Sequence, residues 1–222
     1  MKMKRRAVCS FLLLCALPFC VPARMAGPAA PSAATLTFRR IFPSSTPEFI
    51  EIKVRESSDA ATYEIRQLDE DAGAAPFEVG APLRAKMFEL ASALNHFQGL
   101  DLEIHRKIAN LGEKTFRWEN GAEAHEVRFN YTLNATANQL LQICEGLARQ
   151  QEHIVEIGRR IKYDRLGVNA ALMQFESDLN HKLLPEPQRA LSALDEIAND
   201  ARFVEIARKR ARYLAERIRH QG

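Results

Sequence analysis

The chain lacks the short motifs that mark the commoner kinds of catalytic site. No Gly-x-Ser-x-Gly segment is present, so the nucleophile turn of an α/β-hydrolase is not indicated. No glycine-rich phosphate loop occurs, and no pair of histidines stands at the spacing of a helical zinc site. The sequence therefore indicates no catalytic, cofactor-binding or metal-binding residue.

A hydrophobic run long enough to cross a membrane is also lacking. Ala7–Val21 is free of charge for 15 residues, whereas a bilayer-spanning helix needs about 20. Basic residues precede this run and Val21-Pro22-Ala23 supplies small residues for cleavage, a pattern typical of a secretory signal peptide. We therefore expect residues 1–23 to be removed and the protein to be periplasmic or secreted. Cleavage nearer Ala26 or Ala30, or an uncleaved membrane anchor, is the alternative.

Cleavage after Ala23 would leave a chain that is poor in cysteine and nearly neutral. Three of the four cysteines would be lost, so only Cys144 would remain and no intrachain disulfide could form. The 28 carboxylates would all remain, while four of the 31 basic residues would leave, which gives a net charge of −1. Such a chain has no global field to attract nucleic acid. Cys144 falls on a helical apolar face, so we expect a small core residue rather than a reactive thiol.

The part that follows the signal peptide begins with strands. Residues 24–34 are rich in alanine and proline and show no periodicity, so we expect a disordered tether. Apolar and polar residues then alternate in short segments separated by turn residues, which predicts antiparallel strands. The expected strands are Thr35–Ile41, Phe49–Val54 and Ala61–Gln67, with a shorter edge segment around Phe77 and Val79.

The hydrophobic period then changes to that of a helix. Pro82 suits the first turn, and apolar residues follow at spacings of three and four from Leu83 to Phe97. Gly99 is expected to end this helix, and Leu102–Ala109 to form a further strand.

Residues 114–132 predict a β-hairpin around Asn120-Gly121. Two registers are open: a two-residue turn pairs Glu119 with Ala122, and a four-residue loop pairs Trp118 with His125. Either register places the aromatic side chains on one face, because opposite residues share a face. We expect that face to pack against the preceding helix.

From residue 133 to residue 222 the pattern is helical. Asn134 suits the N-cap of a long helix that reaches Tyr163, and Gly167 interrupts the pattern. Three further helices are expected: around Leu172–Leu183, after Pro185 and Pro187, and from Phe203 to Ile218. The sequence thus predicts an α+β fold, with a small antiparallel sheet covered by a helix in residues 35–132 and an antiparallel helical region in residues 133–222.

Three of the six histidines fall in the sheet region. His96, His105 and His125 would have to converge in space to hold zinc, and nothing in their spacing requires this. An unrecognised hydrolase or metal-binding protein, with a cleft between sheet and helices, is therefore an alternative function. Solvated loops and faces account for the same histidines and carboxylates more simply.

The last helix is locally basic, through Arg208, Lys209, Arg210 and Arg212. A basic amphipathic helix can bind anionic lipid, so contact with a membrane surface is a further alternative. Glu205 and Glu216 interrupt the run, which favours a solvated outer face.

Two segments carry a resemblance to known proteins. FRRIFPSSTPEFIEI (38–52) and GEKTFRWENGAEAHEVRFNYT (112–132) resemble segments of uncharacterised exported proteins of acidobacterial-type bacteria, and the resemblance continues into IKYDRLGVNAAL (161–172). It implies export to the bacterial envelope, with no assigned activity and no functional residue to carry over.

We interpret the sequence as that of an exported protein with an interaction or structural role in the envelope, rather than an enzyme. No cofactor is indicated. The sequence leaves a protein partner open and identifies none.

Overall fold

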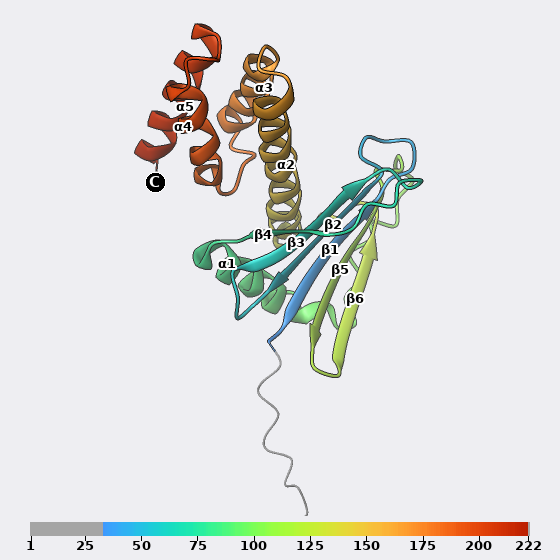
Figure 1. Ribbon diagram of the computed structural model, residues 1–222. Coiled ribbons are helices and arrows are strands. Elements are labelled where there is room, and N and C mark those ends of the chain that lie inside the picture. The colour runs from blue at the N-terminus through green and yellow to red at the C-terminus, as the bar shows by residue number, and fades with distance from the viewer. Residues whose placement is uncertain (1–32, 222) are drawn as a thin grey trace, which may run out of the picture. The chain divides into compact units, whose positions relative to one another are not determined.

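The computed structural model describes residues 33–221. The expected signal peptide and nearly all of the expected tether lie outside this range. Within it the fold is α+β, as the sequence predicts, and combines an antiparallel sheet with several helices (Figure 1). None of the helices in residues 33–221 is both long enough and apolar enough to cross a bilayer.

The sheet has six antiparallel strands in the order β4-β3-β2-β1-β5-β6. The strands are β1 (Thr35–Ile41), β2 (Phe49–Arg55), β3 (Ala60–Arg66), β4 (Ala75–Glu78), β5 (Glu113–Asn120) and β6 (Glu123–Phe129). The first four form a meander, and β5 returns to pair with β1. The predicted hairpin therefore extends the meander into one continuous sheet.

The hairpin adopts the second of the two registers left open by the sequence. Trp118 pairs with His125, and the two strands continue as far as the pair Asn120 and Glu123. The turn is therefore Gly121-Ala122, one residue later than expected. A positive φ at the first central position, +63° at Gly121, is the feature of a type II′ hairpin turn.

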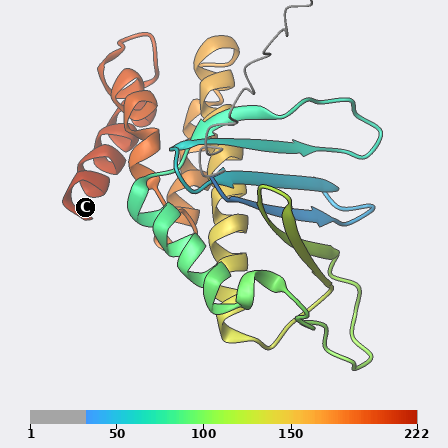
Figure 2. The same ribbon diagram turned by 90° about the horizontal axis from the view of Figure 1, so that it is seen from below.

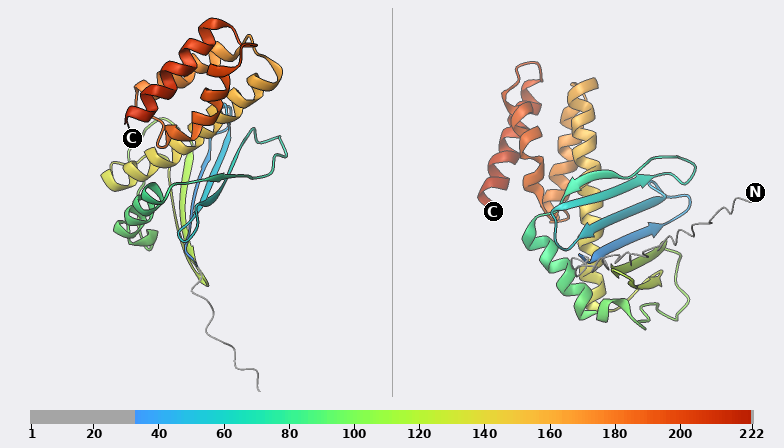
Figure 3. Two further views of the ribbon diagram at one scale, coloured as in Figure 1. Left: turned by 60° about the vertical axis from the view of Figure 1, so that its left-hand side comes forward. Right: turned by 60° about the horizontal axis from the view of Figure 1, so that its bottom comes forward.

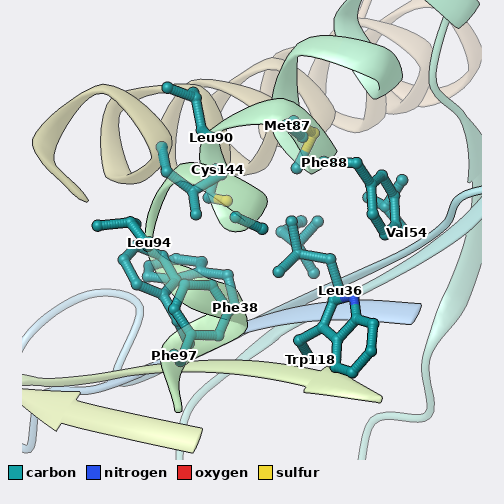
Figure 4. Packing of buried hydrophobic residues seen from close by; sticks show 14 of the residues in the cluster. Leu36, Phe38, Val54, Met87, Phe88, Leu90, Leu94, Phe97, Trp118 and Cys144 are labelled. Atoms are coloured by element: carbon teal, nitrogen blue, oxygen red, sulfur yellow. The ribbon is translucent and has the colours of Figure 1, made fainter. Parts of the chain in front are cut away.

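One face of the sheet is apolar and is covered by helix α1 (Ala81–Ala93) and by the first half of α2 (Ala135–Tyr163). The left view of Figure 3 shows the sheet nearly edge-on, with both helices on the same side, and Figure 2 shows them from below. Aromatic and aliphatic side chains fill the space between the layers, among them Phe38, Phe97 and Cys144 (Figure 4). The expected cover by the first helix is confirmed, and α2 adds a second cover that the sequence pattern did not indicate.

The opposite face of the sheet carries a network of ion pairs. The Glu51 carboxylate lies 2.6 Å from both Arg39 Nη2 and Lys53 Nζ. On β5, Arg117 pairs with Glu119 at 2.7 Å. These paired charges keep the uncovered face polar, as expected for an antiparallel sheet with one solvated side.

Helix α1 ends four residues earlier than the sequence predicts. Its C-cap is Leu94, and the short 3₁₀ turn η1 (Asn95–Phe97) follows, in which all three residues have positive φ between 50° and 69°. This left-handed turn lays the Phe97 ring on Phe116, with 5.5 Å between the ring centroids. The turn of helix expected up to Phe97 is thus replaced by a left-handed turn that packs the Phe97 ring against the hairpin.

The expected strand at Leu102–Ala109 is wrong. This segment has no strand structure. One backbone bond, from the Ile104 N–H to the Tyr131 carbonyl, holds it together with side-chain bonds: Glu103 Oε2 accepts from the Asn130 backbone N–H, and Asn130 Nδ2 donates to the Ala109 carbonyl. The buried Lys114 ammonium donates to the carbonyls of Leu111, Gly112 and Asn130. Burial lowers the pKa of Lys114 below its ordinary value.

The C-terminal part is helical, as predicted. After α2 come α3 (Val168–Asn180), the 3₁₀ turn η2 (Pro187–Ala190), α4 (Leu191–Asn199) and α5 (Glu205–Gln221). Asn134 is the N-cap of α2, and its side-chain oxygen accepts a hydrogen bond from the Ala137 N–H at 3.0 Å. Helix α2 takes part in two hydrophobic clusters, since Leu140 and Cys144 lie in the sheet core and Ile157 lies among α3, α4 and α5.

Candidate binding groove

The three histidines of the sheet region do not converge. The His96 and His125 rings both stack on Trp118, with centroid separations of 4.4 and 6.0 Å. His105 lies apart and exposed, with its Nε2 2.8 Å from Asp101, whose carboxylate raises the pKa of this imidazole through their hydrogen bond. No group of three or more His, Cys, Asp or Glu side chains within residues 33–221 is arranged to hold a metal ion.

Cys144 is enclosed in the core between α2 and the sheet, as the sequence predicts. Burial raises the pKa of its thiol well above the ordinary value, so the thiolate needed for reactivity is disfavoured. The residue acts as a small hydrophobe.

The basic run of the last helix is partly engaged within the protein. Arg208 pairs with Glu205, Arg210 Nε lies 3.5 Å from Glu176, and Arg212 Nη2 donates to the Ala198 carbonyl. The contacts of Arg210 and Arg212 hold α5 against α3 and α4, whereas the Arg208 pair lies within α5. These side chains are thus partly engaged within the protein, and contact with a membrane surface through this run stays a prediction.

A concave surface, here called the groove, lies between α1, α2 and the connection from α3 to η2. Its volume is about 710 Å³. The apolar part of the lining consists of Leu83, Leu90, Ile143, Leu183 and Pro185. Leu83, Lys86 and Pro185 also line a second hollow toward η2, so the groove continues past the start of α1.

The rim of the groove is mainly cationic. Lys86, Arg149 and Lys182 line it, against a single carboxylate, Glu145. Glu145 lies 3.8 Å from Arg40 behind the groove, which offsets part of its charge. The groove thus combines an apolar floor with an excess of positive charge.

Two of the cations are held in place by neighbouring groups. Arg149 Nε lies 3.6 Å from Asp178, whose other contact is His153 Nε2 at 2.8 Å. Lys86 pairs with Glu89 at 3.0 Å on the exposed surface of α1, where such a pair is weak and screened. For Lys182, no carboxylate within residues 33–221 lies within ion-pair distance.

Lys182 occupies a backbone position that normally belongs to glycine. It follows the C-cap of α3, has a φ of +57°, and its N–H donates to the Leu179 carbonyl. The next N–H, of Leu183, donates to the Asp178 carbonyl. These two bonds make a Schellman motif, in which glycine is preferred because a Cβ is unfavourable in the left-handed region. A lysine here costs stability and places its ammonium on the groove.

The connection that forms one wall of the groove is fixed by close packing on α2. An added Cβ at Gly146 would lie 2.9 Å from the Leu183 carbonyl oxygen and 2.8 Å from Pro185 Cγ. Only glycine at this point of α2 lets the connection lie so near the helix.

Hydrogen bonds tie the same connection to α2 and to the start of α1. The Glu186 N–H donates to Gln150 Oε1 at 2.9 Å, and the Glu186 carboxylate accepts from the Gly80 N–H at 2.9 and 3.1 Å. Gly80 is the N-cap of α1, so the carboxylate sits at the positive end of that helix. Arg189 adds an ion pair to Glu78 at 2.6 Å. The walls of the groove are thus joined by polar contacts as well as by the core.

None of the groove residues stands out in the sequence, because their side chains come from α1, α2 and the connection after α3. Lys182 directly follows the C-cap of α3, where glycine is usual, but the sequence pattern extends this helix to Leu183 and so does not mark the position. Without the backbone angle, this residue cannot be separated from an ordinary lysine.

Comparison with protein-family models finds no match, and a search of curated proteins finds no significantly similar sequence. The resemblance to exported proteins of acidobacterial-type bacteria therefore stays a prediction.

Proposed function

We propose that this protein is an exported, non-catalytic binding protein whose groove takes an acidic polypeptide segment that also carries apolar side chains. The observation that carries the proposal is Lys182. A cation stands at a left-handed position where glycine would be more stable, and it lies on the rim of the groove. Local strain retained at a concave surface is a mark of a functional position.

The form of the groove supports a polypeptide as its ligand. It is open along its length and continues toward η2, which suits an extended chain better than a compact small molecule. Its apolar floor would accept aliphatic side chains, and its cationic rim would attract carboxylates. The segment 24–32 of the chain itself does not match, since it carries Arg24 and no carboxylate.

Export to the bacterial envelope belongs to the same proposal. It is supported by the basic start, apolar run and cleavage pattern of residues 1–23 and by the resemblance described above. An envelope location would expose the groove to other exported or membrane-attached proteins.

A random-peptide selection against the immobilised full-length protein tests this function. We expect the enriched peptides to combine Asp or Glu with aliphatic residues and to be poor in Lys and Arg. A variant with Lys86→Glu and Lys182→Glu, both at exposed positions, should lose this enrichment. The matched control, Lys209→Glu, lies on α5 and should keep it. Enrichment of basic peptides by the wild type would contradict the proposal. Enrichment of the same acidic peptides by the Lys86→Glu and Lys182→Glu variant would contradict it as well.

The hydrolase or metal-binding alternative is separated from this function by metal analysis of the purified protein. Stoichiometric zinc, together with loss of the fold on chelation, would favour that alternative. We expect peptide binding to be unaffected by a chelator.

A further inference from the structure

A second surface, at the far end of α3 from the groove, has a different character. It is formed by the connection from α2 to α3 and the connection from α4 to α5, which lie together at the upper end of the helical region in Figure 1. Arg165 of the first connection helps to lower the pKa of Asp200 in the second, which places the two connections within electrostatic reach. We call residues 159–166 and 200–209 the helical tip.

The helical tip exposes large apolar side chains that the folded protein leaves in water. Leu166, on the first connection, is 80% exposed, and Tyr163, the last residue of α2, is 73% exposed. Val204, on the second connection, is 38% exposed, and Ile206, in the first turn of α5, is 59% exposed. Phe203, next to Val204 in the second connection, is buried and anchors that connection in the hydrophobic cluster of the helices. The apolar residues of the tip are therefore presented on a fixed support.

The same tip carries an excess of positive charge. Its two segments hold seven basic side chains and three carboxylates, and with Glu156, which pairs with Arg159 and Arg160, the net charge is +3. Arg202, Arg208 and Lys209 pair with carboxylates of the tip itself. Lys162 Nζ lies 5.0 Å above the Tyr163 ring. Neither Lys162 nor Arg165 has a carboxylate within ion-pair distance among residues 33–221. Cations that remain without partners beside exposed aliphatic and aromatic groups match the interface of an anionic bilayer.

We infer that the helical tip docks on an anionic phospholipid surface, with Tyr163, Leu166 and Ile206 entering the headgroup region and the surrounding cations facing lipid phosphates. An amphipathic aromatic ring and an aliphatic side chain are the groups that gain by leaving water at this depth. The inference does not depend on the groove. Helix α3 separates the two surfaces by about 20 Å, from its 13 residues, so both can be used at once.

Position-specific fluorescence on vesicles tests this docking in the full-length protein. The apolar run of residues 7–21 could itself bring the chain to a bilayer, so the readout must be local to the tip. We therefore place a reporter by Tyr163→Trp, and a control reporter by Leu133→Trp. Leu133 is 66% exposed and lies beside the opposite end of α2. The native Trp118 is almost fully buried, so the wild type supplies the background.

With phosphatidylglycerol vesicles containing brominated acyl chains, we expect the reporter at position 163 to shift to the blue and to be quenched. The reporter at position 133 should do neither. Adding Leu166→Asn and Ile206→Asn should weaken the tip contact by roughly tenfold or more, because two exposed apolar groups are removed. Leu133→Asn should leave it unchanged, and rising salt should weaken it.

Three results would overturn the inference. In the first, the reporter at 163 is not quenched. In the second, both reporters are quenched equally, which would place the contact in another part of the chain. In the third, the reporter at 163 shifts with protein concentration in the absence of vesicles, which would mean that a second copy of the chain, and not lipid, covers the tip.

Discussion

At the scale of single residues, the molecule keeps Lys182 in a conformation that suits glycine. Both hydrogen bonds of the Schellman motif around it are formed, so the backbone at the end of α3 is regular. The unfavourable feature is the presence of a Cβ at a left-handed φ. Lys182 is one of five non-glycine residues with a positive φ in residues 33–221, and it lies on a concave cationic surface. This is the residue on which the proposed function depends most.

Replacing Lys182 by glycine should stabilise the protein. We expect the free energy of unfolding to rise by about 0.5–1 kcal/mol, because glycine has no Cβ and so adopts the left-handed φ without steric cost. Urea denaturation followed by circular dichroism measures it. The same substitution at Lys162, inside the last turn of α2, should instead lower stability by about 1 kcal/mol. A destabilised Lys182→Gly would mean that its ammonium has a structural partner.

Glu51 is one residue on the open sheet face whose contribution to stability should depend on pH. Burial alone would raise its pKa, but hydrogen bonds from Lys53 and Arg39 lower the pKa below its ordinary value of 4.5. A carboxyl with a lowered folded-state pKa contributes stability above pH 4.5 and loses it as pH falls through the folded value. We expect Glu51→Gln to destabilise the protein at pH 7 and to differ progressively less from wild type below pH 4.5. Equal differences at pH 7 and pH 3 would contradict this.

At the scale of helices and strands, the sequence predicts an element well where one hydrophobic period continues for several residues. Ile50–Val54 and the helix that begins after Asn134 are of this kind. Leu102–Ala109 shows a similar alternation, yet only Leu102 is well buried, so the segment lacks the apolar face that a strand needs. The end of α1 could not be predicted either, because the packing of rings on the hairpin, and not local propensity, decides it.

The groove could not be predicted from the sequence. Its cations Lys86, Arg149 and Lys182 are far apart in the chain, and only the packing of the α3–η2 connection on Gly146 brings them to one rim. The Schellman geometry that makes Lys182 unusual is a backbone property that composition and spacing do not report.

The N-cap of α2 offers a direct test at this scale. Asn134→Ala should lower stability by about 1 kcal/mol, since the Ala137 N–H loses its side-chain acceptor. Asn134→Asp should retain most of that stability, because a carboxylate can accept the same bond at the positive end of the helix. Thermal unfolding of the two variants side by side measures the difference, and equal losses would show that the cap bond is not the cause.

At the scale of the whole described chain, α2 joins two hydrophobic clusters, and buried polar bonds reinforce the junction. Gln150 of α2, Glu186 before η2 and Gly80 before α1 form one hydrogen-bonded link beside the groove. A groove with walls joined in this way keeps its form before a ligand arrives, which lowers the entropic cost of binding.

We expect wild-type unfolding to be a single transition, with Trp118 fluorescence reporting the sheet cluster and far-ultraviolet circular dichroism reporting mainly the helices. Glu186→Ala should lower stability by about 2 kcal/mol, because the Gly80 N–H loses a charged acceptor. The same substitution removes the link between α1 and the α3–η2 connection. The unfolding midpoints reported by Trp118 fluorescence and by circular dichroism should therefore no longer coincide. Glu216→Ala, an exposed change on α5, should do neither. Separate transitions in the wild type would show that the clusters unfold independently.

The measurement that bears most directly on the proposed function is the affinity of a selected acidic peptide for the Lys182→Gly protein, by fluorescence polarisation. We expect binding to weaken by about fivefold, the effect of one lost ion pair at a partly exposed site, even though the protein is more stable. Lys162→Gly should be less stable and bind as wild type does. Unchanged affinity in the Lys182→Gly protein would show that this lysine does not serve the groove.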